Sequence, residues 1–216
     1  MTEASTPYGA PGAEAPAGPT PASEAPAPPA LWIPALRDTA VVAAALSLFA
    51  AADAWYGLTG LRLAAVVSVV DGVLVGALVT ALIHEWGHYA GARWAGAIAP
   101  LGKPSSLPLF VFDMEKNEPS QFQAMSVGGN LAHWLVFALL FAALPLATPG
   151  QVAIVAASFG FAVFASQVEF PVIRRVADGM KPLESLARIA VPDLKTSLGR
   201  KALAGAGAGL VLSLFL

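Results

Sequence analysis

Residues 61–94 constrain this chain more than any other segment of its sequence. They are apolar almost throughout and contain no proline, so they predict one long helix. A run of this length exceeds the roughly 20 residues that cross a bilayer, and its last turns are expected to emerge into water. The bilayer is therefore the natural solvent for this part of the chain.

Further apolar stretches surround this segment. Only 12% of the residues are charged, about half the share found in an average soluble domain, and 56% are hydrophobic. We therefore predict an all-α polytopic membrane protein, a bundle of about four to five transmembrane helices in contact with the lipid bilayer. The expected spans are residues 39–56, 61–94, 126–147, 151–170 and, although it is short, 202–216.

Two segments of different composition complete the organisation. Residues 1–30 are mostly Pro, Ala, Gly, Ser, Thr and Glu and are predicted to form a disordered tail, which leaves 31–216 as the membrane-embedded domain. Residues 95–124 contain several helix-breaking prolines, and residues 109–112 favour a short strand. We expect a small β-hairpin or re-entrant loop beside the membrane at this point.

Charge limits the partners and orients the chain. The net charge of −2 provides no basic field, so no nucleic-acid partner is expected, and the absence of cysteine excludes disulfides and thiolate metal sites. Residues 171–201 are rich in arginine and lysine, whereas the link at 148–150 carries no charge. The positive-inside rule then places residues 171–201 and the 95–124 loop in the cytoplasm, in a plasma or inner membrane.

The HEWGH cluster at residues 84–88 carries the strongest chemical signal. His84 and His88 are four residues apart, and a helix stacks such a pair on one face, close enough to share a metal ion. Glu85 lies beside the first histidine, where it can act as a general base toward water and as an acid toward a leaving amine. This is the H-E-x-x-H pattern of zinc peptidases. Ionisable groups at membrane depth are costly and usually mark function.

A third ligand has to come from elsewhere, because zinc in a catalytic site takes three protein ligands. The candidates are Asp71, Asp113, His133, Glu169 and Asp178. Asp71 lies too far along the same helix, Asp113 has the setting of a solvated turn acid, and His133 favours an interhelical hydrogen bond. Glu169 and Asp178 both lie near the cytoplasmic end of the fourth span, at the right level to face the cluster.

Three motifs in this order resemble the site-2 protease family of intramembrane zinc metalloproteases. The HEWGH cluster and the Ala-Arg-Trp-Ala-Gly run at 92–96 are similar to the family's HExGH helix and the residues that trail it. Gly128-Gly129-Asn130 opens the next span, where the family has a Gly-Pro and a nearby asparagine. Asp178-Gly179 resembles the family's Leu-Asp-Gly motif, although the Asn-Pro that precedes it there is absent here. The resemblance covers about residues 60–185.

The resemblance implies an intramembrane zinc metalloendopeptidase that cleaves a peptide bond in or near a transmembrane segment of a membrane-protein substrate. It implies Zn²⁺ held by His84, His88 and Asp178, with Glu85 as the catalytic residue. Glu169 stays open as the alternative third ligand. Asn130 would bind the substrate backbone or the developing oxyanion, or would serve as a polar helix contact.

Two other functions stay open. A non-catalytic metal-binding relative, acting as a membrane chaperone or assembly factor, is compatible with the missing Asn-Pro. A metal transporter would need further polar ligands at several depths, and only Asp53 and Asp71 offer them. Gly72 and Gly76 form a GxxxG pair, which favours helix packing over a functional role.

Overall fold

The computed structural model describes residues 30–103, 108–189 and 194–216. The predicted tail at residues 1–30 therefore lies outside the described residues except for Ala30, as do residues 104–107 of the predicted loop. Six helices follow one another in the described chain: α1 (Trp32–Thr59), α2 (Arg62–Trp94), α3 (Pro119–Ala143), α4 (Pro149–Ala177), α5 (Pro182–Ala187) and α6 (Leu194–Ser213).

The four helices α1 to α4 are long and apolar enough to cross a membrane. They confirm the prediction of an all-α membrane bundle with about four spans, and α6 is not among them. The longest, α2, has 33 residues. It therefore measures about 50 Å, well above the roughly 30 Å of a hydrocarbon core.

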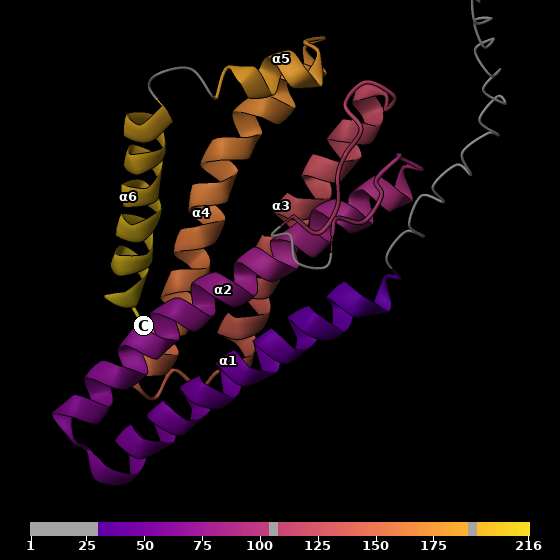
Figure 1. Cartoon of the computed structure of the whole chain (residues 1–216). Coiled ribbons are helices and arrows are strands. Elements are labelled where there is room, and N and C mark those ends of the chain that lie inside the picture. The colour runs from indigo at the N-terminus through magenta and orange to yellow at the C-terminus, as the bar shows by residue number, and fades with distance from the viewer. Residues whose placement is uncertain (1–29, 104–107, 190–193) are drawn as a thin grey trace, which may run out of the picture.

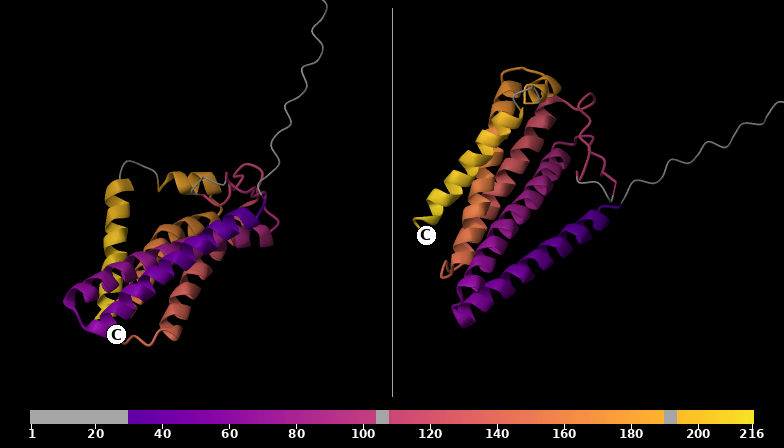
Figure 2. Two further views of the ribbon diagram at one scale, coloured as in Figure 1. Left: turned by 60° about the horizontal axis from the view of Figure 1, so that its bottom comes forward. Right: turned by 60° about the vertical axis from the view of Figure 1, so that its left-hand side comes forward.

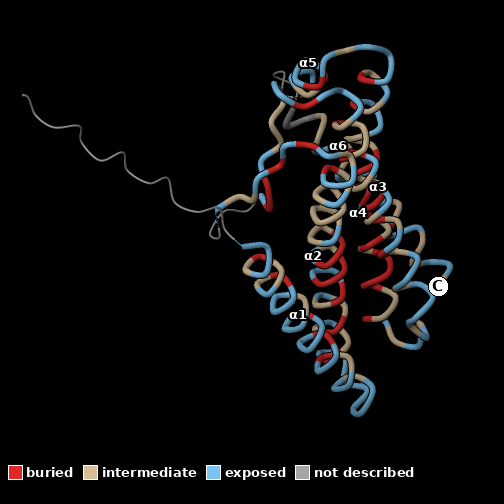
Figure 3. The backbone as a smooth tube through the Cα atoms, turned by 90° about the vertical axis from the view of Figure 1, so that its right-hand side faces the viewer, coloured by how far each residue is buried: buried red, intermediate tan, exposed pale blue. Residues whose placement is uncertain are grey.

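The central element of the bundle is α2, which packs against α1, α3 and α4. In turn α4 packs against α3 and α6, so that α1 lies along one edge of the bundle and α6 along the other (Figures 1 and 2). Buried residues gather where α2, α3 and α4 face one another, whereas α1 is mostly exposed (Figure 3). Exposed apolar side chains of α1, such as Leu36 and Leu48, suit contact with lipid.

Local capping chemistry sets two helix boundaries. Gly60 has a left-handed φ of 64° and ends α1, so the helix continues to Thr59, beyond the expected end of the first span at residue 56. The start of α3 differs from the prediction, because the helix begins at Pro119 rather than near residue 126. Glu118 and Gln121 form a capping box there, and proline suits a first helical position.

The C-terminal half of α4 also differs from the prediction, because the helix continues through Pro171 to Ala177 instead of ending near residue 170. Proline has no N–H to donate to the preceding turn, so packing has to hold the helix together at this point. Val172 and Val176 provide that packing, since both are buried in a cluster with Phe122 of α3.

The connection between α2 and α3 is a compact loop rather than a hairpin of two strands. Its described residues form a single antiparallel bridge, between Leu101 and Phe110, so the predicted strand at 109–112 is reduced to one bridged residue. Asn117 closes the base of the loop, accepting from the Ile98 N–H at 2.7 Å and donating to its carbonyl at 2.8 Å. Leu109 and Phe110 are buried against the end of α2.

Glycines let α3 approach α2 closely at the level of the HEWGH cluster. A Cβ on Gly87 of α2 would collide with the carbonyl of Gly128 on α3, and a Cβ on Gly91 would collide with the carbonyl of Ala124. Helices in membranes commonly use small residues in this way to bring their backbones together. The glycine inside the HEWGH cluster is therefore a packing residue.

Glycines also join the other helices of the bundle. A Cβ on Gly72 or Gly76 of α2 would meet the backbone of Gly150 or Ile154 on α4, as the GxxxG spacing predicts. On α6, a Cβ on Gly205 would meet the backbone of α4 in the same manner. Close backbone contact thus runs from α3 through α2 and α4 to α6.

Gly87→Ala is expected to destabilise the bundle, whereas Gly207→Ala is not. The methyl group added at residue 87 would meet the α3 backbone, and such overpacking costs about 1–3 kcal/mol. Gly207 on α6 has nothing within 4 Å of the position of a Cβ, so the same change there only adds helix propensity. Thermal unfolding of the purified chain in detergent measures both variants. Equal melting temperatures would contradict the close contact between α2 and α3.

Candidate metal centre

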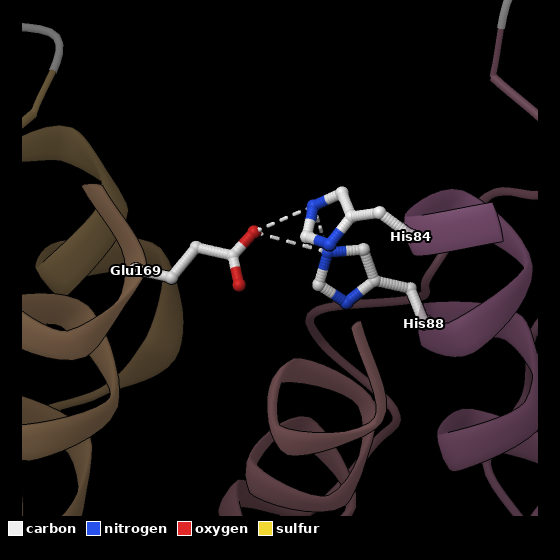
Figure 4. A group of neighbouring side chains, drawn as sticks. All are labelled: His84, His88 and Glu169. Carbon is white, nitrogen blue, oxygen red and sulfur yellow. Dashed lines mark hydrogen bonds and ion pairs between the residues drawn. The ribbon is translucent and has the colours of Figure 1, made fainter. Parts of the chain in front are cut away.

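Three side chains from two helices converge inside the bundle (Figure 4). His84 and His88 lie on one face of α2, and Glu169 of α4 reaches them from the opposite side. The two Nε2 atoms lie 3.1 Å apart, and Glu169 Oε1 lies 3.0 Å from His84 Nε2 and 3.1 Å from His88 Nε2. The three atoms therefore form an almost equilateral triangle.

Two backbone carbonyls of α3 fix the protons on the histidine rings. His84 Nδ1 lies 2.9 Å from the carbonyl oxygen of Gly129, and His88 Nδ1 lies 3.0 Å from that of Met125. A carbonyl oxygen only accepts hydrogen bonds, so each Nδ1 carries the hydrogen. In a neutral ring the Nε2 atom then presents a lone pair. Gly129 also makes room for His88, because a Cβ there would overlap the ring.

Lone pairs that face one another repel unless a metal ion or a proton lies between them. Tetrahedral zinc with bonds of about 2.0–2.1 Å separates its ligand atoms by about 3.3 Å. The observed separations of 3.0–3.1 Å are close to that value. Two imidazoles and a carboxylate also form a donor set that suits zinc and related divalent ions, and three protein ligands are usual in catalytic sites. The group could therefore hold a metal ion.

The third position of the triangle is filled by Glu169 and not by Asp178. Asp178 is the exposed C-cap residue of α4 and lies about 13 Å farther along the helix axis than Glu169. The physical reason is that α4 stays helical through Pro171, so the two acids cannot lie at one level. Gly179 does adopt a left-handed φ of 96°, but the turn that it forms lies beyond the site. The expectation for Asp178 is corrected accordingly.

Asn130 supports the carboxylate of the site. Its side-chain amide donates one hydrogen bond to Glu169 Oε2 and another, at 3.0 Å, to the carbonyl of Ser126. The side chain is only 6% exposed. The structure therefore gives Asn130 a polar contact between α3 and α4, the second of the two roles that the sequence left open.

His133 lies behind the metal-binding group and is not one of its members. Its ring is fully buried, with Nδ1 3.1 Å from His84 Nδ1 and Nε2 3.2 Å from the Ser166 hydroxyl. These are the interhelical contacts that the sequence favours for this histidine. Sequence reasoning missed Ser166, and the signal available was its place one turn before Glu169 on the same face of α4.

Glu85 contacts the loop between α2 and α3. Its Oε1 atom accepts a hydrogen bond of 3.2 Å from the Leu109 N–H, and its carboxylate takes no part in the triangle of ligand atoms. A carboxylate beside the ligands, but not bound as one of them, is the arrangement that a general base requires.

The other acids considered as ligands lie elsewhere. Asp113 accepts hydrogen bonds of 3.1 Å from the N–H groups of Glu115 and Lys116 and pairs with the Lys116 ammonium at 3.2 Å. The N–H and the ammonium of Lys116 hold the pKa of Asp113 below its usual value, which fits a solvated turn acid. Asp71 lies about 20 Å from His84 along α2.

Trp86, the third residue of the cluster, connects the site to α1. Its indole N–H donates to Asp38 Oδ2 at 2.9 Å. Asp38 is 7% exposed, and its other oxygen accepts from Arg37 Nε at 2.7 Å. The helix turn that carries both histidines is therefore tied to the first span.

A separate polar contact lies at the opposite end of the bundle. Asp53 of α1 accepts hydrogen bonds from the hydroxyls of Ser68 and Thr148, at 2.8 and 2.6 Å, and from the Gln151 amide at 3.1 Å. Its carboxylate joins α1, α2 and the start of α4. The contact explains a charged residue in an apolar helix without any role in the metal site.

Comparison with known proteins assigns this chain to no family. No family profile, curated protein or solved structure matches it. Its function therefore has to be argued from the geometry of the site.

Glu169→Gln is expected to lose the metal ion, and Asp178→Asn is expected to keep it. The first change removes the charged oxygen that faces both histidines, whereas the second alters an exposed residue on the same helix. Loss of a residue that only supports a ligand typically lowers metal affinity by about 10–100-fold. The affinity of Glu169→Gln for zinc should fall by more than that. Metal analysis and zinc competition on the purified chain measure both, with His84→Ala as a second metal-free reference. Loss of metal from Asp178→Asn alone would contradict this assignment.

Proposed function

We propose that this chain is a membrane-embedded zinc endopeptidase that hydrolyses a peptide bond in or near a transmembrane segment of another membrane protein. The observation that carries the proposal is the triangle of His84, His88 and Glu169, with Glu85 next to it on the same helix turn. This combination supplies a metal site and an unligated base together.

Peptide hydrolysis at this site would use the metal ion, Glu85 and Leu109 in different roles. Zinc, when bound, supplies a Lewis acid that polarises a peptide carbonyl and lowers the pKa of water. Glu85 accepts one proton from the attacking water and passes it to the leaving nitrogen as the C–N bond breaks. The oxygen and the remaining hydrogen of that water stay on the carbonyl carbon, which gives one new carboxyl and one new amino terminus. The Leu109 N–H holds the Glu85 carboxylate in place before the reaction.

The depth of the site supports a substrate that lies in the membrane. His84 is about 15 Å from the C-terminal end of α2 along the helix axis, inside a helix long and apolar enough to span. A helical substrate hides its carbonyl groups in hydrogen bonds, so its segment must unwind before Glu85 and water can reach one. A segment close to the membrane surface meets this requirement most easily, because water can satisfy the released backbone groups.

Charge supports a cytoplasmic location for this end of the bundle. Arg174 and Arg175 lie in the last turn of α4, and Lys181 and Arg188 flank α5. The C-terminal ends of α2 and α4 lie at this same end of the bundle (Figure 1). The positive-inside rule then directs the metal site toward the cytoplasm.

One observation favours a non-catalytic metal-binding role, such as that of a membrane chaperone or assembly factor. The Glu85 carboxylate already accepts a hydrogen bond from Leu109, which a working base has to share or give up. Metal transport has less support, because Asp53 is bonded to three neighbouring side chains and offers no ligand along a path. Substitution of Glu85 separates hydrolysis from metal binding alone.

Glu85→Gln is expected to abolish proteolysis and to leave the metal content unchanged. Glutamine keeps an oxygen that can accept from the Leu109 N–H, but it cannot take a proton from water. New protein N-termini in membranes of cells that express each chain provide the measurement. The wild type should generate N-termini in or beside transmembrane segments, and Glu85→Gln should reduce them by at least about 100-fold. Equal sets of N-termini from the two chains would contradict the peptidase proposal and favour the non-catalytic role.

A further inference from the structure

We propose that Asn130, His133 and Ser166 form a directed hydrogen-bond chain that links His84 to Glu169 and holds both in the geometry for metal binding. The three residues come from α3 and α4 and are 6%, 0% and 6% exposed, respectively. Their hydrogen bonds connect them to one another and to His84 and Glu169. The inference rests on the metal site proposed above.

The direction of the chain is fixed at its first member. The Gly129 carbonyl requires the hydrogen of His84 to lie on Nδ1. His133 Nδ1 lies 3.1 Å from that nitrogen, so it must be an acceptor that shares this one hydrogen with the Gly129 carbonyl. The hydrogen of the neutral His133 ring then lies on Nε2, which donates to the Ser166 hydroxyl at 3.2 Å. One backbone carbonyl thus determines the tautomers of two histidines.

The second half of the chain has a similarly fixed direction. Ser166 Oγ also accepts from the indole N–H of Trp134 at 3.1 Å, and that group can only donate. Both lone pairs of the hydroxyl are then used, so its hydrogen points to Asn130 Oδ1 at 3.4 Å. The Asn130 amide turns its nitrogen to the Ser126 carbonyl and to Glu169 Oε2.

One arrangement of hydrogens satisfies every member of this chain. A flipped Asn130 amide would set its oxygen against the Glu169 carboxylate and the Ser126 carbonyl, and its nitrogen against the Ser166 hydroxyl hydrogen, so three contacts would become repulsive. Burial makes such errors costly, because electrostatic repulsion between polar groups is stronger in the low-dielectric interior than in water. The hydrogen-bond chain therefore fixes one arrangement of the side chains of the site in the absence of a metal ion.

This state has two consequences for the ligands. His84 keeps its hydrogen on Nδ1, which leaves the Nε2 lone pair free toward Glu169 and His88. Glu169 has its Oε2 atom held by Asn130, so that Oε1 is the oxygen presented to both histidines. Asn130, His133 and Ser166 are positioning residues, and changes to residues of this kind typically lower metal affinity by about 10–100-fold.

A matched pair of serines on α4 provides the test. Ser166→Ala breaks the middle of the hydrogen-bond chain, whereas Ser158→Ala removes another buried serine, which accepts a 2.8 Å hydrogen bond from Thr80. Ser166→Ala loses hydrogen bonds to His133, Trp134 and Asn130, whereas Ser158→Ala loses one to Thr80, so the melting temperature without metal should fall further in Ser166→Ala. Metal affinity is therefore compared at a temperature at which both variants are folded. Only Ser166→Ala should lose about 10–100-fold in affinity for Zn²⁺, with a shifted visible spectrum when Co²⁺ is bound in its place.

The outcomes separate this inference from the proposed metal site. If the wild type binds Co²⁺ and both serine variants bind it equally well with one spectrum, the positioning role is overturned and the metal site stands. If the wild type binds neither Co²⁺ nor Zn²⁺, the metal site fails and this inference fails with it. If the affinity for Zn²⁺ falls in Ser166→Ala but not in Ser158→Ala, the positioning role of the hydrogen-bond chain is supported.

A measurement on the unaltered protein covers the case in which Ser166→Ala does not fold. The chain contains three histidines, so nitrogen-15 NMR of the zinc-loaded wild type can report the tautomer of each ring. We expect hydrogen on Nδ1 in His84 and His88 and on Nε2 in His133 alone. Hydrogen on Nδ1 of His133 would reverse the direction of the hydrogen bonds and overturn the inference.

Discussion

A histidine ring inside a membrane helix has two nitrogens to satisfy without water, and α3 satisfies one of them on each ring of this site. The carbonyls of Gly129 and Met125 take the Nδ1 hydrogens of His84 and His88. The Nε2 atoms are thereby left bare, facing each other and one carboxylate oxygen. An arrangement of this kind is unfavourable on its own and becomes favourable around a cation. The capacity of this group to hold a metal ion thus depends on the backbone of a helix that provides none of its three side chains.

That backbone can reach the rings only because the two helices touch without intervening side chains. Gly87 and Gly91 of α2 face Gly128 and its neighbours on α3, and Gly129 leaves space for the His88 ring. The close packing of α2 on α3 therefore depends on these glycines. The tautomers of His84 and His88, and the positions of their Nε2 atoms, depend in turn on that packing. The same dependence explains why glycine stands inside the HEWGH cluster, between Glu85 and His88.

The sequence predicts part of this site and leaves the rest undetermined. Helical periodicity alone puts His84 and His88 on one face and sets Glu85 beside them. The third ligand depends on whether Pro171 ends α4 or lies within it, and local sequence is compatible with both. Burial of Val172 and Val176 decides for the helix, and these contacts with α3 are not visible in a single sequence. The contact between Glu85 and Leu109 is equally long-range, since it depends on how the loop folds back over α2.

The hydrogen bond between Trp86 and Asp38 ties the first span to the helix turn that carries His84 and His88. Most of α1 contacts only α2, and its buried carboxylate holds the indole that stands between Glu85 and Gly87. A sideways or piston movement of α1 therefore pulls on the turn that carries both imidazoles. The first span is thus joined to α2 in two ways, by apolar packing around Phe49 along most of its length and by this single indole at the turn that carries the histidines.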